Sequence, residues 1–470
     1  MMKHLKFFLF ALSALVCLNA CNENAPEGGG GDDPQPGNIE WKFVPATGVL
    51  TISGTGAMPN YTSDNRPEWE EHKDYILEVV IKDGVTSVGD RAFYDYKNLS
   101  EVGFPPSLKT IGKSAFYFCK QLQNVDLSGT ALKKMGEGAF WACRQLQKVD
   151  LSGTALTTIP FRAFYFCDAL TEVILPTGLQ SIEGGAFQDC VALAKLHVPG
   201  KKEVDLPSEK LISIGDSAFQ YCEALPEIVF PGSVETVGDK AFMECKSLRQ
   251  VDMSGSGIWQ LGKQVFEKCV ALETVTWKEG ITTVPERAFS GCKNLKTVEN
   301  FNGAKIIEHA AFWNCAFLDL SLPASIEQID MAAFCQCGFK EINLPAGLKT
   351  LGEGAFMNCY NSALKGLENC TLLTVIPKEA FSGVGKYVTG WTLEIPANIT
   401  KIEYGAFNNC NGLNTVKCHA TTPPELGNIA FPDNRTSSST VKLFVPAESV
   451  EAYKYSSWRT YFYYDNIRPL

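Results

Sequence analysis

The sequence has 470 residues, more than one compact core usually organises, so we expect either several domains or a repeat array. Hydrophobic residues make up 45% of the chain and charged residues 20%, as in ordinary folded soluble proteins, and the formal net charge is −10. So acidic a chain is a poor candidate for nucleic-acid binding, because phosphate recognition needs clustered Lys and Arg.

Residues 1–20 have the features of an export signal. Lys3 and Lys6 form a charged start, and Phe7 to Val16 form an apolar stretch too short to span a bilayer. Leu18-Asn19-Ala20-Cys21 then resembles the lipobox of bacterial lipoproteins, which implies cleavage before Cys21 and lipidation of that residue. The alternative is an ordinary secretory signal in which Cys21 is incidental. No later segment reaches roughly 18 apolar residues, so we expect membrane attachment through the lipid anchor only.

Residues 21–38 form a tether rich in Gly, Pro and Asp. This segment has no apolar face with which to fold, so we expect it to be flexible and to lift the rest of the chain off the membrane. Acidic residues soon after a lipidated Cys loosely resemble the surface-export signals of some lipoproteins. We therefore expect an exported protein that is anchored to the outer membrane and faces the cell exterior.

A repeat dominates the rest of the chain. The pair Ala-Phe recurs in one phase, with Val in place of Ala before Phe266, and most spacings are 22 to 26 residues. The Phe positions are 93, 116, 140, 164, 187, 219, 242, 266, 289, 312, 334, 356, 381, 407 and 431. A Cys stands three residues later in twelve repeats, and a short Val-x-Leu run follows further on. Such self-similarity predicts stacked coils that share one core.

Each part of the repeat has a physical reason. Val-x-Leu alternates with period two, which predicts a short strand with two residues inward and one outward. Pro or Ser-Gly then ends the strand and turns the chain. A Gly before Ala-Phe, such as Gly352, is expected to allow a second tight turn. Ala permits close packing, and Phe is expected to fill the centre of the coil.

The carried motif reads Leu-x-x-Val-x-Leu-Pro, then Leu-x-x-Ile-Gly-x-x-Ala-Phe-x-x-Cys, and it resembles the BspA-like (Treponema-type) leucine-rich-repeat family. The resemblance implies an α/β repeat solenoid, a right-handed coil of about 15 repeats of about 23 residues with short parallel strands. We expect an N-terminal β cap over 39–82, the solenoid over 83–445 and a C-terminal cap over 446–470, because end coils expose apolar faces.

Seventeen cysteines in an exported chain suggest disulfides at first. Twelve, however, share one repeat phase and should form an inward row about one strand spacing apart, slightly too far for bridges. We expect these twelve to be reduced, small buried apolar residues. The sequence leaves the state of Cys335, Cys370 and Cys418 open.

No catalytic, cofactor or metal motif is present. The four histidines after the signal form no His-Glu-x-x-His pattern, and there is no Gly-x-Ser-x-Gly elbow. The segment Gly257 to Lys263 reads GxxxxGK, but Gln264 stands where a phosphate-binding loop needs Ser or Thr. We expect a protein that is not an enzyme and needs no metal or cofactor.

The outward residues of the short strands should form a row on an open sheet face. The candidate ligand-binding residues on or near it are Asp126, Asp150, Ile174, His197, Asp252, Thr276, Glu299, Trp259 and Trp277. Without a ligand, the same row is simply a solvated sheet surface, and such Trp residues can instead fill gaps between coils.

Four functions are weighed against these features. Resemblance to the BspA-like family implies adhesion to a host or bacterial surface protein. The alternative is a glycan-binding accessory protein for nutrient capture, which predicts exposed Trp or Tyr clustered on one face. The third is an enzyme, which would require clustered titratable side chains with perturbed pKa values in a cleft. The fourth is a purely structural role in a surface layer.

Overall fold

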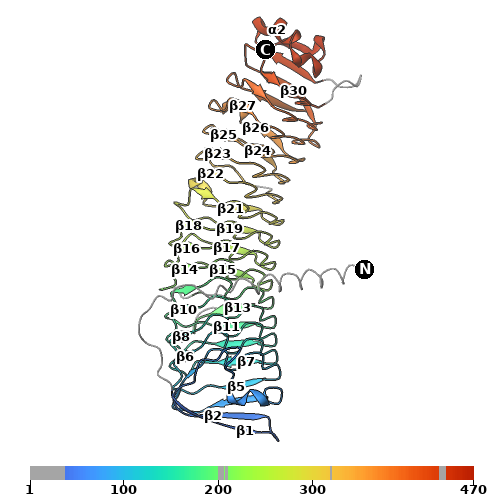
Figure 1. Ribbon diagram of the computed structural model, residues 1–470. Coiled ribbons are helices and arrows are strands. Elements are labelled where there is room, and N and C mark those ends of the chain that lie inside the picture. Colours follow the sequence, from blue (N-terminus) through green and yellow to red (C-terminus); the bar gives the residue numbers. More distant parts are fainter. Residues whose placement is uncertain (1–36, 200–205, 207–209, 318–319, 433–440) are drawn as a thin grey trace. The chain divides into compact units, whose positions relative to one another are not determined.

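The computed structural model describes residues 37–199, 206, 210–317, 320–432 and 441–470. The predictions for the export signal, for Cys21 and for most of the tether fall outside the described residues. The described chain is wound into coils that succeed one another from the blue strands to the red ones (Figure 1).

Most coils contribute a strand to a first series of parallel strands, called the first ladder, which is divided into several shorter sheets. Among the described residues, the coil between Glu299 and Glu341 contributes no strand to it. In most of these strands the central residue is buried and its two neighbours point outward, as in β7, where Val125 lies between Asn124 and Asp126. The strands of this ladder are β3 (Glu78–Ile81), β5 (Glu101–Gly103), β7 (Asn124–Asp126), β9 (Lys148–Asp150), β11 (Glu172–Ile174), β13 (Lys195–His197), β15 (Glu227–Val229), β17 (Gln250–Asp252), β19 (Thr274–Thr276), β21 (Thr297–Glu299), β24 (Glu341–Asn343), β26 (Ala363–Lys365), β28 (Trp391–Ile395), β30 (Leu413–Cys418), β32 (Lys442–Val445) and β33 (Ile467–Pro469).

A second parallel ladder consists mostly of two-residue strands, in which the second residue points into the core. Its strands are β4 (Val85–Val88), β6 (Thr110–Ile111), β8 (Lys134–Met135), β10 (Thr158–Ile159), β12 (Ser181–Ile182), β14 (Ser213–Ile214), β16 (Thr236–Val237), β18 (Gln260–Leu261), β20 (Thr283–Val284), β22 (Ile306–Ile307), β23 (Gln328–Ile329), β25 (Thr350–Leu351), β27 (Val375–Ile376), β29 (Lys401–Ile402) and β31 (Glu425–Leu426).

The N-terminal end begins with an antiparallel hairpin of β1 (Asn38–Val44) and β2 (Val49–Ala57). Strand β2 then pairs in parallel with both β3 and β4, so one long strand starts both ladders. A short 3-10 helix, Glu68–His72, carries the buried Trp69, whose ring stacks on Phe93 at 5.9 Å. The first coil is thereby covered.

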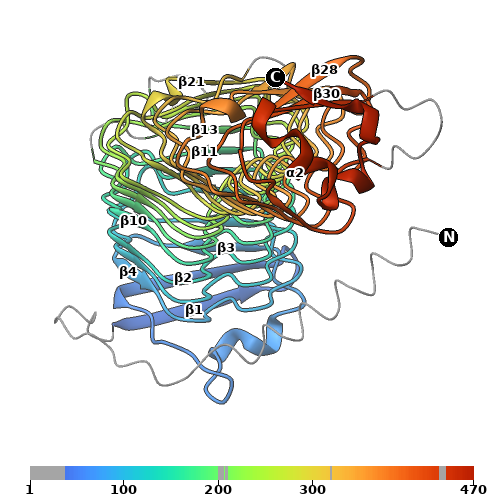
Figure 2. The same ribbon diagram turned by 90° about the horizontal axis from the view of Figure 1, so that it is seen from above.

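The C-terminal end is built from short helical turns. These are a 3-10 turn Ala447–Ser449, the helix α2 (Val450–Lys454), and 3-10 turns Ser457–Thr460 and Tyr464–Asn466. Figure 2 shows α2 at the near end of the stack. Two further 3-10 turns, Phe301–Gly303 and Leu367–Asn369, replace ordinary turns within coils. Helix α2 is the one α-helix among the described residues, so helical content is low in a fold that otherwise confirms the predicted solenoid.

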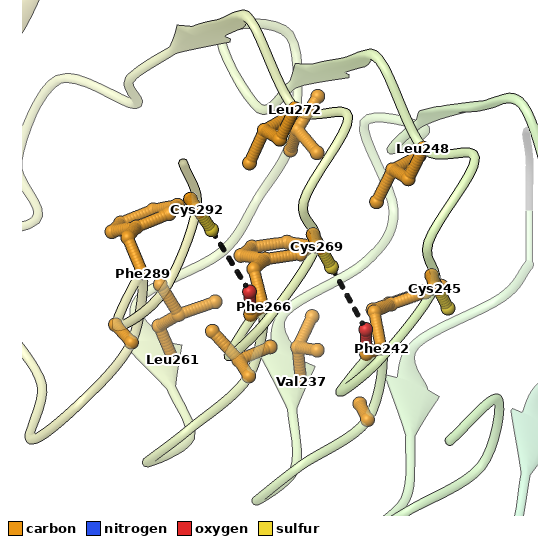
Figure 3. Packing of buried hydrophobic residues seen from close by; sticks show 14 of the residues in the cluster. Val237, Phe242, Cys245, Leu248, Leu261, Phe266, Cys269, Leu272, Phe289 and Cys292 are labelled. Carbon is orange, nitrogen blue, oxygen red and sulfur yellow. Dashed lines mark hydrogen bonds between the residues drawn. The ribbon is translucent and has the colours of Figure 1, made fainter. Parts of the chain in front are cut away.

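The repeated phenylalanines form one continuous stack through the core. All fifteen are buried, and neighbouring ring centroids are 5.1 to 5.8 Å apart with interplanar angles of 3° to 18°. Figure 3 shows three of them, Phe242, Phe266 and Phe289. They lie between Leu248 and Leu272, which stand two residues before β17 and β19, and the inward residues Val237 and Leu261 of the second ladder. Such stacked aromatic pairs add stability beyond their buried area.

The cysteine beside each ring bonds to the neighbouring coil. In all twelve in-phase repeats the thiol donates to the carbonyl of the Phe one coil earlier, at 3.0 to 3.3 Å, as Cys269 does to Phe242 (Figure 3). All fifteen cysteines of the described residues are free thiols, including Cys335, Cys370 and Cys418. The prediction of reduced, inward cysteines is confirmed, and hydrogen bonding adds to their apolar role.

The turn around Ala-Phe differs from expectation. The left-handed positions are the residue before Ala and the second residue after Phe, as in Arg162 with φ 53° and Phe166 with φ 59°. The Gly further upstream has another reason: a Cβ on Gly352 would lie 2.3 Å from the Met331 nitrogen of the preceding coil. A turn does begin directly after Gly352, as predicted, but Gly352 itself is not left-handed, and glycine at that position permits close approach to the backbone of the preceding coil.

Candidate binding surfaces

The predicted row of outward residues exists as two sets of strands in register. Asp126, Asp150, Ile174 and His197 are aligned across β7 to β13. Val229, Asp252, Thr276 and Glu299 are aligned across β15 to β21. The outward side chains of these eight strands are called the strand face here. Its rows arise because residues of adjacent parallel strands occupy equivalent positions in each coil.

Three aspartates of the strand face are already engaged in the turns that end their strands. Asp126 Oδ1 accepts hydrogen bonds from the backbone nitrogen and the hydroxyl of Ser128, at 3.0 and 2.7 Å. Asp252 makes the same pair of contacts with Ser254, and Asp150 accepts from the Ser152 nitrogen. Such local bonds are typical of Asx turns. These carboxylates therefore have a structural role whether or not they meet a ligand.

Glu172 is the centre of a charged group on the strand face. Lys148 Nζ lies 3.4 Å from Glu172 Oε2, and His197 Nε2 lies 3.2 Å from Oε1. Burial alone would raise the pKa of Glu172, but the hydrogen bond with His197 and the nearby Lys148 outweigh it and lower the pKa. The group crosses β9, β11 and β13 and fixes the side chains of three coils.

The two predicted tryptophans lie in different surroundings. Trp277 is 1% exposed, packs edge-on against Phe301 and donates from Nε1 to the Ile281 carbonyl at 3.1 Å. The prediction that it belongs to a ligand-binding face is therefore wrong. Trp259 is 66% exposed but directly precedes β18, so it lies beside the second ladder and not on the strand face.

A second surface was not among those predicted from the sequence. The residue after the repeated Phe is aromatic in the first four repeats, as Tyr94, Tyr117, Trp141 and Tyr165. Tyr94 and Tyr117 stack at 4.7 Å, Tyr117 and Trp141 are 5.4 Å apart, and Trp141 and Tyr165 meet edge to face at 4.8 Å. This line of rings is called the aromatic edge. Comparing that repeat position across coils would have revealed it.

A cavity of about 480 Å³ lies where the aromatic edge ends. Phe161, Arg162, Gln188, Asp216 and Ser217 line it together with Gly184, Gly185 and Gly215. The guanidinium of Arg162 lies over three rings, 4.7 Å from the centroid of Phe161, 5.1 Å from that of Trp141 and 5.2 Å from that of Tyr165. Contacts of this kind hold a cation in one orientation.

The described residues include no group of three or more His, Cys, Asp or Glu side chains placed to hold a metal ion. The segment that resembles a phosphate-binding loop contains strand β18, and Gly262 packs against Gly238 of the preceding coil, as the repeat requires. Among the described helices, none has the length and apolar character needed to cross a membrane.

Comparison with known proteins agrees with the coil geometry. The family described as BspA type leucine rich repeat region matches in six copies, over residues 71–194, 200–319, 305–436 and 374–463. No curated protein matches the chain significantly.

Solved structures of similar fold come from several bacteria. A leucine-rich repeat protein from Bacteroides ovatus is 23% identical with a TM-score of 0.53, over 69% of this chain and 91% of that one. A leucine rich cell surface protein from Faecalibacterium prausnitzii is 20% identical with a TM-score of 0.37, over 84% and 95% of the two chains. At 23% identity, the likeness to the Bacteroides ovatus protein concerns the fold alone. With the repeat matched over most of its length, the chain belongs to the BspA-type leucine-rich-repeat family.

Proposed function

We propose that this chain is an exported surface lipoprotein, held in the outer membrane through Cys21, which binds a host or bacterial surface protein through its strand face and catalyses no reaction. The observation that carries the proposal is the register of the strand face, which aligns mostly charged and polar side chains of successive coils within each of its two sets of strands. A surface assembled this way presents many equivalent contact points, as protein interfaces require.

The charge of the strand face indicates the kind of partner. Glu101 on the adjacent β5 and Glu227 and Glu299 on the face are exposed carboxylates, whereas Lys148 is already paired with Glu172. A basic partner surface would complement this excess of acid, and the association rate should then fall as salt rises.

The structure indicates which charges of the strand face can be reversed without breaking a turn. Reversing the charge of Asp126, Asp150 or Asp252 would remove hydrogen bonds within turns. The test therefore uses the double variant Glu227→Lys with Glu299→Lys. Residues 39–470 would be screened against host matrix proteins and bacterial surface proteins at physiological salt. A specific hit that the double variant weakens at least tenfold supports the proposal. Glu235→Lys, exposed outside the strand face, is the matched control. A partner bound equally by the double variant would overturn the strand face as the site.

The anchor needs its own test. We expect Cys21→Ser to move the full-length chain from the membrane fraction to the soluble fraction, because the acyl chains would be missing. Mass spectrometry of the wild-type N-terminus should find a lipidated Cys21. An unmodified N-terminus, or a membrane-bound variant, would contradict the lipoprotein assignment.

A further inference from the structure

We propose that the aromatic edge and its cavity form a second binding site, for an acidic sugar residue of a glycan. The site lies on the turns around Ala-Phe and does not depend on binding by the strand face.

The cavity has the composition that a sugar ring requires. A sugar ring presents an apolar face of C–H groups bordered by hydroxyls, so it needs one exposed aromatic ring with hydrogen-bonding side chains around it. Phe161 is 41% exposed and supplies the ring. Gln188, Asp216 and Ser217 supply amide, carboxylate and hydroxyl groups in the same cavity. Its volume of about 480 Å³ is within the range of sites that hold small ligands.

The cavity exists because three residues that line it are glycines, which have no side chains to fill the space. The glycines at 184, 185 and 215 leave space above Phe161 and Arg162: a Cβ on Gly185 would lie 3.2 Å from Arg162 Cγ, and one on Gly184 3.4 Å from Phe161 Cδ2. Asp216 is itself held in place, because its Oδ1 accepts a hydrogen bond of 2.8 Å from the Asp239 nitrogen.

Of the described side chains that line the cavity, Arg162 is the one cation, beside the single carboxylate of Asp216, and it is the group that favours an acidic sugar. Arg162 has no carboxylate within ion-pair distance among the described residues, although the chain as a whole carries a net charge of −10. Its fork of donors, held over three rings, matches the geometry of a carboxylate or sulfate. Two further cations lie nearby: Arg91 is 5.4 Å from the ring of Tyr94 in the aromatic edge, and Lys120 is 4.9 Å from the ring of Phe118, which stacks on Tyr117.

The test uses residues 39–470 and an array of defined oligosaccharides of three kinds: uronic-acid-containing, sulfated and neutral. We expect acidic oligosaccharides to bind and to change the fluorescence of Trp141. Phe161→Ala removes an exposed ring, and Arg162→Gln removes the charge while keeping much of the stem. Each should weaken binding at least tenfold.

Lys240→Gln is the matched control, since Lys240 occupies the repeat position of Arg162 with φ 58° in a coil without the aromatic edge. Circular dichroism should show all three variants folded. Binding of neutral oligosaccharides alone, retention of binding by both site variants, or no binding up to about 1 mM would overturn the inference. If the strand-face variants bound a protein partner as well as the wild type, the proposed function would fail, but the inference about the acidic sugar would be unaffected.

Discussion

At the scale of single residues, the Phe-x-x-Cys spacing explains why Cys recurs where any small apolar residue would fit. The Phe carbonyl accepts a backbone bond within its own coil, as Phe242 does from Cys245 at 3.3 Å, and the thiol of the next coil provides a second donor. Burial raises the pKa of these thiols, so they remain neutral donors at physiological pH. One coil, with Val384 in place of Cys, dispenses with that bond.

Cys269→Ala should lower the free energy of unfolding by about 1–2 kcal/mol, because it removes a donor to the Phe242 carbonyl and leaves a small cavity. Cys269→Val, which copies the natural Val384 of another coil, should recover part of this loss by filling space without donating. The midpoint of urea denaturation measures both. An alanine variant as stable as the wild type would show that the thiol bond contributes nothing.

A second prediction concerns Asp189. Burial, together with the nearby Asp168 and Glu223, raises the pKa of Asp189 to about 7. A carboxyl whose folded pKa exceeds its unfolded value stabilises the protein fully below about pH 4, and that contribution is lost as the pH rises to about 7. Asp189→Asn should therefore raise the free energy of unfolding by on the order of 1 kcal/mol at pH 8 and change little at pH 4.

Asparagine suits this left-handed position, since Asn314, Asn358 and Asn409 occupy the same place in other coils with φ of 58° to 65°. Thermal melts of the wild type and variant across that pH range provide the measurement. A stability difference that does not change with pH would refute the assigned pKa.

At the scale of elements, aromatic side chains of the C-terminal cap cover the last coil of the solenoid. Phe431, the last ring of the stack, contacts Trp458 at 5.4 Å and Phe462 at 5.3 Å, and Trp458 Nε1 donates to the Pro424 carbonyl at 2.9 Å. Tyr453 packs edge-on against Trp458. The crowded aromatics of the C-terminal cap thus cover an apolar end that has no further coil.

Trp458→Ala should destabilise the C-terminal coils by about 3–5 kcal/mol, the usual loss for a buried Trp. Because each coil contacts only its neighbours, the effect should decline along the stack. Hydrogen exchange should accelerate in β29 to β33 and stay unchanged in β5 to β11. Tyr455→Ala, at a side chain that is 74% exposed, is the control. Uniform acceleration through all coils would indicate global cooperativity instead.

The elements also show what the sequence could and could not predict. Repeat phase places Trp277 in the second inward position of Val275-Thr276-Trp277, where other coils have Leu127 or Leu175, so its burial was open to prediction. The turn bonds of Asp126 were likewise open to prediction, from the Asp-x-Ser spacing. The position of Arg162 over three rings was not predictable, because it depends on side-chain packing between coils.

At the scale of the whole molecule, stability should follow from the number of coils and the contacts between neighbours. Deleting residues 243–266 joins Phe242 to Glu267-Lys268-Cys269 and so preserves Phe-x-x-Cys while removing β17 and β18. The variant should fold, because β15 and β19 carry equivalent inward residues and Phe242 can stack on Phe289. Deleting residues 243–254 alone removes half a coil and shifts one ladder against the other, so apolar side chains would face solvent. Circular dichroism and binding of a hydrophobic dye distinguish the two variants. If the half-coil deletion proved as well folded as the whole-coil deletion, folding would not depend on keeping the repeat in phase. That result would contradict a core built from stacked equivalent coils.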